Sequence, residues 1–198
     1  MPSPIGHVMA GIAAAWTADL IPGQRAWRVV PESASRFRRA GNGLTLVCAG
    51  LGAAPDLDLL LGGHRTVTHS LGAVIFVWLF AAALAANAER PIVRVSLMCA
   101  AAYGTHLLLD WLGTDRISPR GIEILWPLNH EWYTSGTDVF RQTARQEFLT
   151  APILLQNLRA IVQELVILGP TLVALWLVRV KALAGLSSEV TRGDHAAQ

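Results

Sequence analysis

The feature that most constrains this chain is the apolar segment Leu71–Ala88, which runs for 18 residues without a charged side chain. A helix needs about 20 consecutive apolar residues to cross the hydrocarbon core of a bilayer. The next segment, Ile92–Leu112, is 21 residues long and mostly apolar. Two such segments in succession predict membrane-spanning helices. We expect Ser70 or Thr68 to cap the first one, and Arg94, near the start of the second, to extend its side chain to the membrane interface.

The composition supports a membrane protein of one domain. Hydrophobic residues make up 53% of the 198 residues and charged residues only 15%, whereas a soluble domain carries about 25% charged residues. The excess of apolar surface needs a lipid bilayer or a large partner to cover it. The net charge is only +2, so the composition gives no reason to expect a nucleic-acid partner.

Three further apolar segments complete the predicted fold, which is an all-α polytopic helix bundle with about four or five spanning helices. They are Ile5–Leu20, Gly43–Ala54 and Ala160–Val180. We expect residues 113–158 to form a polar, turn-rich region, residues 1–180 to form one domain, and residues 181–198 to form a loose polar tail. No basic stretch precedes the first apolar segment, so we expect no cleaved signal peptide.

The two cysteines lie inside apolar segments of the sequence. Cys48 falls in the second segment and Cys99 in the fourth. Buried free thiols are common in such surroundings, and we favour them over a disulfide.

The order of the segments predicts which residues share a side of the membrane. If each segment crosses once, one side of the membrane holds His7, residues 55–70 and residues 106–158. The other side holds residues 21–41, residues 87–94 and the tail. The second side carries ten of the sixteen basic residues. Basic residues are enriched on the cytoplasmic side, so we predict that the first side, which holds the candidate functional residues, faces away from the cytoplasm.

Near the end of the fourth segment, His106 and Asp110 have the spacing of two side chains on one helical face. A carboxylate in an apolar helix is costly unless it is paired or bound to a metal. We therefore interpret the pair as metal ligands. The alternative is a hydrogen bond between them that ties helices together.

The connector before Leu71 carries the other ligand types. Asp56 and Asp58 are two residues apart, so in an extended backbone their side chains point in opposite directions and only one of them would be a ligand, whereas a turn in the backbone would let both bind. The alternative for this pair is a solvated turn in which Asp58 caps a helix. His64 and His69 lie too far apart for one helical face, but they suit a loop folded around a metal ion.

Four residues near these histidines are candidates for supporting roles. Thr66 and Thr68 are placed to orient the ligands through hydrogen bonds. Arg65 suits either the binding of a phosphate during catalysis or a contact with lipid headgroups. His130 lies in a loop on the same side of the membrane, where it suits a general acid or a further ligand.

His7, at the start of the first segment, completes the candidate ligand set. The set exceeds the needs of one tetrahedral ion, which suggests either two metals or one metal with acid–base residues. Nitrogen and oxygen donors of this kind suit zinc above all, with manganese or iron as alternatives. The predicted ligands are His7, Asp56, Asp58, His64, His69, His106 and Asp110.

These motifs together resemble those of the bacterial and archaeal membrane-bound metal-dependent hydrolases. The matched features are Gly6-His7, Pro55-Asp56-x-Asp58, His64-Arg65-x-x-Thr68-His69-Ser70 and His106-x-x-x-Asp110. More distantly, the order of the ligands is similar to that of zinc-dependent phospholipase C and related nucleases. That similarity implies an all-helical fold and a zinc cluster held by His7, Asp56, His69, His106 and Asp110. The chain departs from the phospholipase pattern because it begins with Met1-Pro2 and has no second His-x-x-x-Glu pair.

We therefore expect an inner-membrane, metal-dependent hydrolase. Its metal would activate water against an ester, and the best candidate is a phosphoester of a lipid or a lipid-linked molecule that enters from the bilayer. The alternative is a non-enzymatic membrane protein whose His/Asp cluster handles metal or stabilises the bundle. The sequence does not specify the substrate or the oligomeric state.

Overall fold

The computed structural model describes residues 1–21, 41–61, 65–144, 146–147 and 149–196, with side chains described as far as residue 182. Within these residues the regular structure is helical, as predicted, and β-structure is limited to two isolated bridges, one joining Gly113 to Phe140 and one joining Ile122 to Tyr133. The described α-helices are α1 (Pro4–Ala18), α3 (Gly43–Ala53), α4 (Leu71–Asn87), α5 (Ile92–Leu112) and α6 (Ala151–Ala196). Two 3₁₀-helices, η2 (Ala54–Leu61) and η3 (Val67–His69), occupy the connector between α3 and α4.

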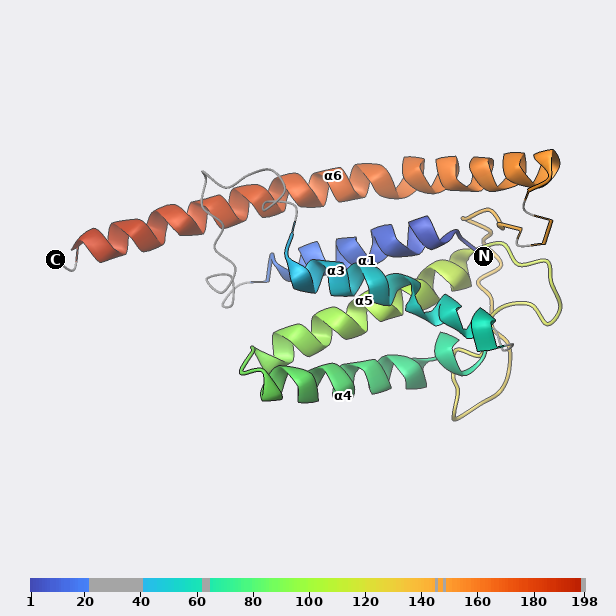
Figure 1. Cartoon of the computed structure of the whole chain (residues 1–198), viewed down its shortest axis with the longest axis horizontal. Helices are drawn as coiled ribbons and strands as arrows, with labels where there is room; N and C mark the ends of the chain where they lie inside the picture. The colour runs from blue at the N-terminus through green and yellow to red at the C-terminus, as the bar shows by residue number, and fades with distance from the viewer. Residues whose placement is uncertain (22–40, 62–64, 145, 148, 197–198) are drawn as a thin grey trace.

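The helices form an elongated bundle in which successive elements run in alternating directions (Figure 1). Helix α1 contacts α3, α5 and α6, while α4 packs against α5. This alternation brings the start of α1, η2, η3, the end of α5 and the start of α6 to one end of the bundle. The predicted grouping of the ligand-bearing segments at one end therefore agrees with the fold.

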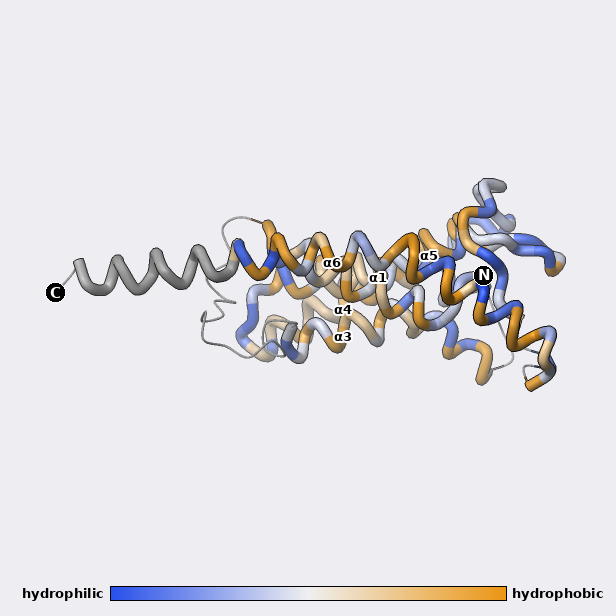
Figure 2. The backbone as a smooth tube through the Cα atoms, turned by 90° about the horizontal axis from the view of Figure 1, so that it is seen from above, coloured by the Kyte–Doolittle hydropathy of each residue, from blue (hydrophilic) through white to orange (hydrophobic). Residues whose placement is uncertain are grey.

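Three described helical segments are long and apolar enough to cross a membrane, namely Gly43–Leu60, Ile92–Leu112 and Ala151–Ala182. Helix α4 is apolar but only 17 residues long, and α1 has 15 residues. Large apolar side chains point outward from the bundle, including Phe76 on α4 and Val166 on α6, each 68% exposed. Figure 2 shows hydrophobic residues along the helices and many hydrophilic residues in the loops beside the N-terminus. A surface of this kind needs lipid to cover it.

Two buried polar contacts attach α6 to α1. At the ligand-bearing end, the carboxylate of Glu164 accepts hydrogen bonds from the backbone N–H (2.6 Å) and the hydroxyl group of Ser3, the N-cap of α1. At the other end, Asp19 accepts from Arg179 of α6 at 2.7 Å and from Arg94 of α5 at 2.6 Å. The expectation that Arg94 extends to the interface is wrong, because the side chain is 4% exposed and paired with Asp19.

Helix α6 also differs from the predicted segment at both ends. It begins at Ala151, so the end of the region 113–158 is helical and not a polar loop. It continues through Ala196, so the tail expected to be loose is helical in this structure. Leu154, Leu155 and Leu158 are 47–56% exposed, which gives this first part of α6 an apolar surface that the sequence prediction assigned to a loop.

Glycine allows α1 and α3 to approach each other closely. A Cβ atom on Gly52 would lie 2.3 Å from the carbonyl oxygen of His7, and one on Gly11 would lie 2.3 Å from that of Cys48. Gly11 and Gly52 face each other across the two helices, so this is the small-residue contact typical of membrane helix pairs. Cys48 and Cys99 are both buried and neither forms a disulfide, as predicted.

The region that joins α5 to α6 folds over the ligand-bearing end of the bundle. Ile122 from this region is fully buried in a cluster with Met1, Tyr103 and Leu107. The Tyr103 hydroxyl donates to the Thr68 carbonyl at 2.6 Å, which fixes η3 against α5. Ser70 caps α4 by accepting from the backbone N–H of Ala73 at 3.1 Å, which confirms it as one of the two expected caps.

We predict that Gly52→Ala separates α1 from α3 and destabilises the protein in detergent by about 1–3 kcal/mol, the usual cost of overpacking. The matched control is Gly50→Ala on the same helix, where an added Cβ meets no atom within 4 Å. That change should stabilise the helix by up to about 1 kcal/mol. Thermal unfolding of both variants in one detergent tests the contact, and equal midpoints would show that the close approach is not needed.

Candidate metal centre

Four elements bring five of the predicted ligands to one buried cluster. His7 comes from α1, Asp56 from η2 and His69 from η3, while His106 and Asp110 come from successive turns of α5. The three histidines are fully buried, and Asp110 is 2% exposed. The side chain of Asp56 is 13% exposed. The 3₁₀ conformation of η2, which replaces the expected extended backbone, follows directly from α3 and carries Asp56 to the end of α5.

The Asp110 carboxylate is surrounded by imidazole rings. Its Oδ1 lies 3.3 Å from Nε2 of His7, and its Oδ2 lies 3.2 Å from Nε2 of His106 and 3.4 Å from Nε2 of His69. The rings of His7 and His106 are stacked with centroids 3.7 Å apart. All three imidazole rings therefore direct their Nε2 atoms at the Asp110 carboxylate.

The imidazole nitrogens also converge on one another and on Asp56. Nε2 of His69 lies 3.1 Å from Nε2 of His106. Oδ1 of Asp56 lies 3.8 Å from the first of these nitrogens and 3.9 Å from the second. The donor atoms fall into two sets, and within each set all the atoms lie within 4.8 Å of one another. One set comes from His7, Asp56 and His106, and the other comes from His69, His106 and Asp110. Because both include His106, the sets form one continuous cluster that could hold a metal ion.

The outer nitrogens of two rings have partners that fix their orientation. Nδ1 of His106 lies 2.8 Å from the carbonyl oxygen of Gly52, which can only accept a hydrogen bond. Nδ1 of His69 lies 3.2 Å from Oδ2 of Asp58. A ring that donates from Nδ1 keeps the lone pair of Nε2 free, and histidines that bind metals are held in this way. Asp58 therefore contacts the outer side of His69, while Asp56 faces its inner side.

Two members of the cluster contain buried polar atoms without a hydrogen bond among the described residues. These are both ring nitrogens of His7 and both carboxylate oxygens of Asp110. Leaving a buried carboxylate unsatisfied costs several kcal/mol. A divalent cation among the inward-facing nitrogen and oxygen atoms would remove this cost, and zinc, manganese and iron all accept such donors. The residues present therefore fit a metal ion.

The pKa of His69 reflects the negative charge of its neighbours. Burial alone would lower it, but hydrogen bonds with Asp56 and Asp58 and the charge of Asp110 outweigh burial and raise the pKa to about 9. A proton on His69 thus balances part of the negative charge of the carboxylates around it.

Asp56 connects the buried cluster to a cavity of about 510 Å³. Asp56 is the one member of the cluster that lines it. The other walls include Leu57, Leu59 and Leu60 of η2 and Ile161 of α6. Leu60 is 83% exposed, so the cavity has an apolar wall beside the cluster.

Two predicted site residues, Arg65 and His130, lie away from the cluster. His64 falls outside the described residues. The guanidinium group of Arg65 forms an ion pair with Asp115 and lies 5.5 Å from the centre of the Trp132 ring. His130 has a side chain that is 72% exposed, and its Nδ1 lies 3.3 Å from Glu123. The structure does not bring the Arg65 or His130 side chains into contact with the five clustered residues.

Sequence analysis missed the supporting role of Gly52 and did not assign Asp58 to the outer side of His69. The signal for Gly52 was its spacing of four from Cys48, matching that of Gly11 from His7, because such spacings mark close helix contacts that expose a backbone carbonyl. Thr68, predicted to orient ligands, donates to Asp58 at 2.6 Å and lies 3.0 Å from Nδ1 of His69. No comparable sequence signal distinguished Asp58 from Asp56.

The fold and the cluster define a class of protein: an all-helical membrane protein with a buried His/Asp group that could hold a metal ion. Residues 1–184 match the YdjM inner membrane protein family, and the chain belongs to that family. A comparison with curated proteins finds no match, and a comparison with solved structures finds none either.

We predict that metal affinity rises with pH. The raised pKa of His69 means that the metal-free protein keeps a proton there up to about pH 9, and metal binding must displace it. The zinc affinity of chelator-treated protein should therefore increase between pH 6 and pH 8, by roughly tenfold for each proton displaced per pH unit. Competition with a zinc chelator of known pH dependence measures this, and an affinity independent of pH would argue against His69 as a ligand.

Proposed function

We propose that the protein is a metal-dependent hydrolase whose ligands are His7, Asp56, His69, His106 and Asp110. The observation that carries the proposal is the convergence of Nε2 atoms from three buried histidines on the unsatisfied carboxylate of Asp110. Resemblance to the membrane-bound metal-dependent hydrolases, and more distantly to zinc-dependent phospholipase C, supports the same set of ligands.

When bound, a divalent metal would lower the pKa of a coordinated water molecule and polarise the ester. The protein's own contribution is to hold the ligands in place. The Gly52 carbonyl and Asp58 orient His106 and His69. Asp56 lies between the cluster and the cavity, so its carboxylate is placed where water and substrate enter.

The proposed substrate is a phosphoester of a lipid or lipid-linked molecule. The cavity at Asp56 has a wall of leucines, and the protein is embedded in a membrane, so a lipid reaches this wall without first entering water. In the reaction, the oxygen of water forms a bond to phosphorus, one ester P–O bond breaks, and the departing oxygen takes up a proton.

Arg65 is already paired with Asp115, so we propose that it has a structural role in the site and does not bind phosphate directly. His130, at 72% exposure, is given no step in the reaction.

We further propose that the bundle spans the inner membrane four or five times, as one domain over residues 1–180. This count includes α1 and α4, which are shorter than the three candidate spans. The alternating directions of the helices in Figure 1 and the excess of basic residues on the far side favour a site on the extracytoplasmic face.

The second candidate function is a non-enzymatic one, in which the cluster stores metal or holds the helices together. The observation that favours it is the nearly complete burial of the cluster, which joins α1 and α5 through η2 and η3. A purely structural role predicts that loss of the metal destabilises the protein and that no ester is hydrolysed.

We predict that the protein purified in detergent contains about one to three equivalents of zinc, manganese or iron. His69→Ala and Asp110→Ala should each lose most of the metal together with any phosphodiesterase activity. The control is Asp138→Asn, which changes an exposed carboxylate in the α5–α6 connection. Elemental analysis and an assay with bis(p-nitrophenyl) phosphate provide the two readouts. Bound metal with no activity on any phosphoester would favour the second candidate, and absence of metal from correctly folded protein would contradict the hydrolase and leave a polar cluster that holds the helices together.

A further inference from the structure

A second cavity lies beside the one at Asp56 and has a different character. It has a volume of about 620 Å³, within the range of small-molecule sites, which is roughly 300–1,000 Å³. The two cavities share Thr143 and Ala144 in their walls. We call the one at Asp56 the leucine cavity and the second one the glutamine cavity, because Gln142, Gln146 and Gln156 line the second.

The shared wall is a short backbone segment held from both sides. Thr143 donates from its backbone N–H to the Met1 carbonyl at 3.0 Å. Ala144 exchanges two hydrogen bonds with the Asn157 side chain on α6, at 2.8 and 2.9 Å. The segment is therefore a wall common to the two cavities, and a molecule that reaches Asp56 lies next to the glutamine cavity.

The charges of the side chains that line the glutamine cavity are balanced. Its charged side chains are Arg65 and Asp115, which form an ion pair with each other. Asp115 also accepts from the backbone N–H groups of Ile117 and Gly121, at 3.1 and 2.8 Å. The amino group of Met1 donates to the Thr114 carbonyl at 2.9 Å. A ligand with an ammonium group would meet Arg65 and the Met1 amino group, and it could pair with Asp115 only by breaking this ion pair, which would leave Arg65 buried without a partner.

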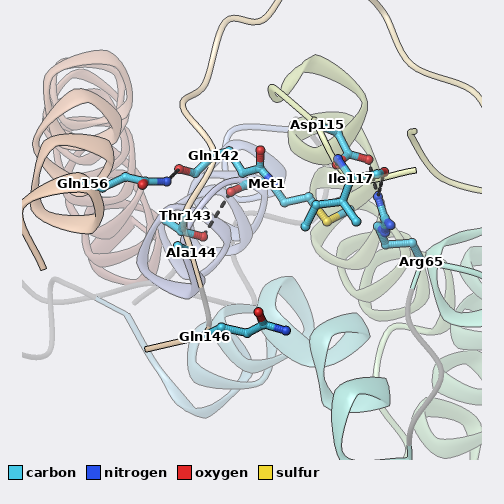
Figure 3. A pocket seen from close by; sticks show the side chains of 9 residues that line it. All are labelled: Met1, Arg65, Asp115, Ile117, Gln142, Thr143, Ala144, Gln146 and Gln156. Atoms are coloured by element: carbon cyan, nitrogen blue, oxygen red, sulfur yellow. Dashed lines mark hydrogen bonds and ion pairs between the residues drawn. The ribbon is translucent and has the colours of Figure 1, made fainter. Parts of the chain in front are cut away.

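The remaining polar groups are amides and a hydroxyl, which both donate and accept hydrogen bonds. Figure 3 shows Gln156 at the left of the cavity, Gln146 at the bottom, Arg65 and Asp115 at the right, and Met1 between Gln156 and that pair. Gln156 donates to the Gln142 carbonyl at 3.2 Å. A carboxamide beside hydroxyl groups of a ligand can satisfy both directions of hydrogen bonding, so such a lining suits neutral groups rich in hydroxyls.

We infer that the glutamine cavity binds the uncharged, hydroxyl-rich headgroup of a phospholipid, such as glycerol or a sugar, whose phosphate lies at the metal cluster and whose chains lie along the leucine cavity. This inference deepens the proposed function and relies on it for the position of the phosphate. It excludes lipids whose headgroup carries an ammonium group as preferred substrates.

The test compares three lipids that share the same acyl chains: phosphatidylglycerol, phosphatidylethanolamine and phosphatidylserine. Chelator-treated protein, which cannot perform metal-dependent hydrolysis, is mixed with equal amounts of the three, and native mass spectrometry counts the lipids retained. We expect phosphatidylglycerol to be retained roughly two- to tenfold more than either of the others, the ratio that one net hydrogen bond supplies. Equal retention of the three lipids would overturn the inference.

Variants identify the cavity responsible. Gln146→Leu removes an exposed amide in the lining and should abolish the preference, while Gln146→Glu adds a negative charge and should shift retention toward phosphatidylethanolamine. The matched control is Gln163→Leu on α6, because Gln163 holds the loop at Arg141 and Val139 but does not line the cavity. A control that loses the preference as fully as Gln146→Leu would attribute the effect to the loop and contradict the assignment.

Measuring lipid retention and lipid hydrolysis separately distinguishes a failure of this inference from a failure of the proposed function. If the metal-loaded protein hydrolyses none of the lipids but the metal-free protein prefers phosphatidylglycerol, the hydrolase proposal fails and the headgroup cavity stands. If the metal-loaded protein hydrolyses all three lipids at equal rates and retains them equally, the hydrolase proposal stands and the headgroup cavity is refuted.

Discussion

The structure depends on the burial of one carboxylate, that of Asp110, among three imidazole rings. A buried carboxylate costs several kcal/mol unless it is compensated, so the surrounding elements must bring polar partners to it. His106 does so from the preceding turn of the same helix, whereas His7 and His69 come from α1 and η3. The need to neutralise Asp110 therefore joins elements that are far apart in the sequence, and a divalent cation among the same donors would complete the neutralisation.

The close contact between α1 and α3 makes this arrangement possible. Because neither Gly11 nor Gly52 has a Cβ, the two backbones approach until each glycine meets the carbonyl of the opposite helix. This contact places His7 beside the stacked ring of His106, and it leaves the Gly52 carbonyl pointing to Nδ1 of His106. One packing feature thus positions a candidate ligand and also orients another. The attachment of α6 through Glu164 and Arg179 then covers the exposed side of α1.

Much of the fold was predictable because apolar length and helix spacing act locally. The segments that became α1, α3, α4 and α5 were predicted to within a few residues, and the antiparallel order placed their ligand-bearing ends together. The beginning of α6 was not predicted, because its first residues are interrupted by polar side chains and resemble a loop in a single sequence. Arg94 was assigned to the interface since a lone arginine in an apolar helix usually extends outward; its partner, Asp19, comes from another helix.

By itself the sequence determined the kinds of side chain available, the apolar helices that need a membrane, and the i,i+4 pairing of His106 with Asp110, since each of these depends on residues close together in the chain. Only the tertiary structure decided which of the two aspartates in η2 faces the cluster, which nitrogen of each histidine points inward, and that Arg65 is paired with Asp115. These properties depend on contacts between residues up to a hundred positions apart, such as His7 and Asp110, and no local pattern encodes them. The cavities also depend on the tertiary structure, because their walls combine η2, the α5–α6 connection and α6.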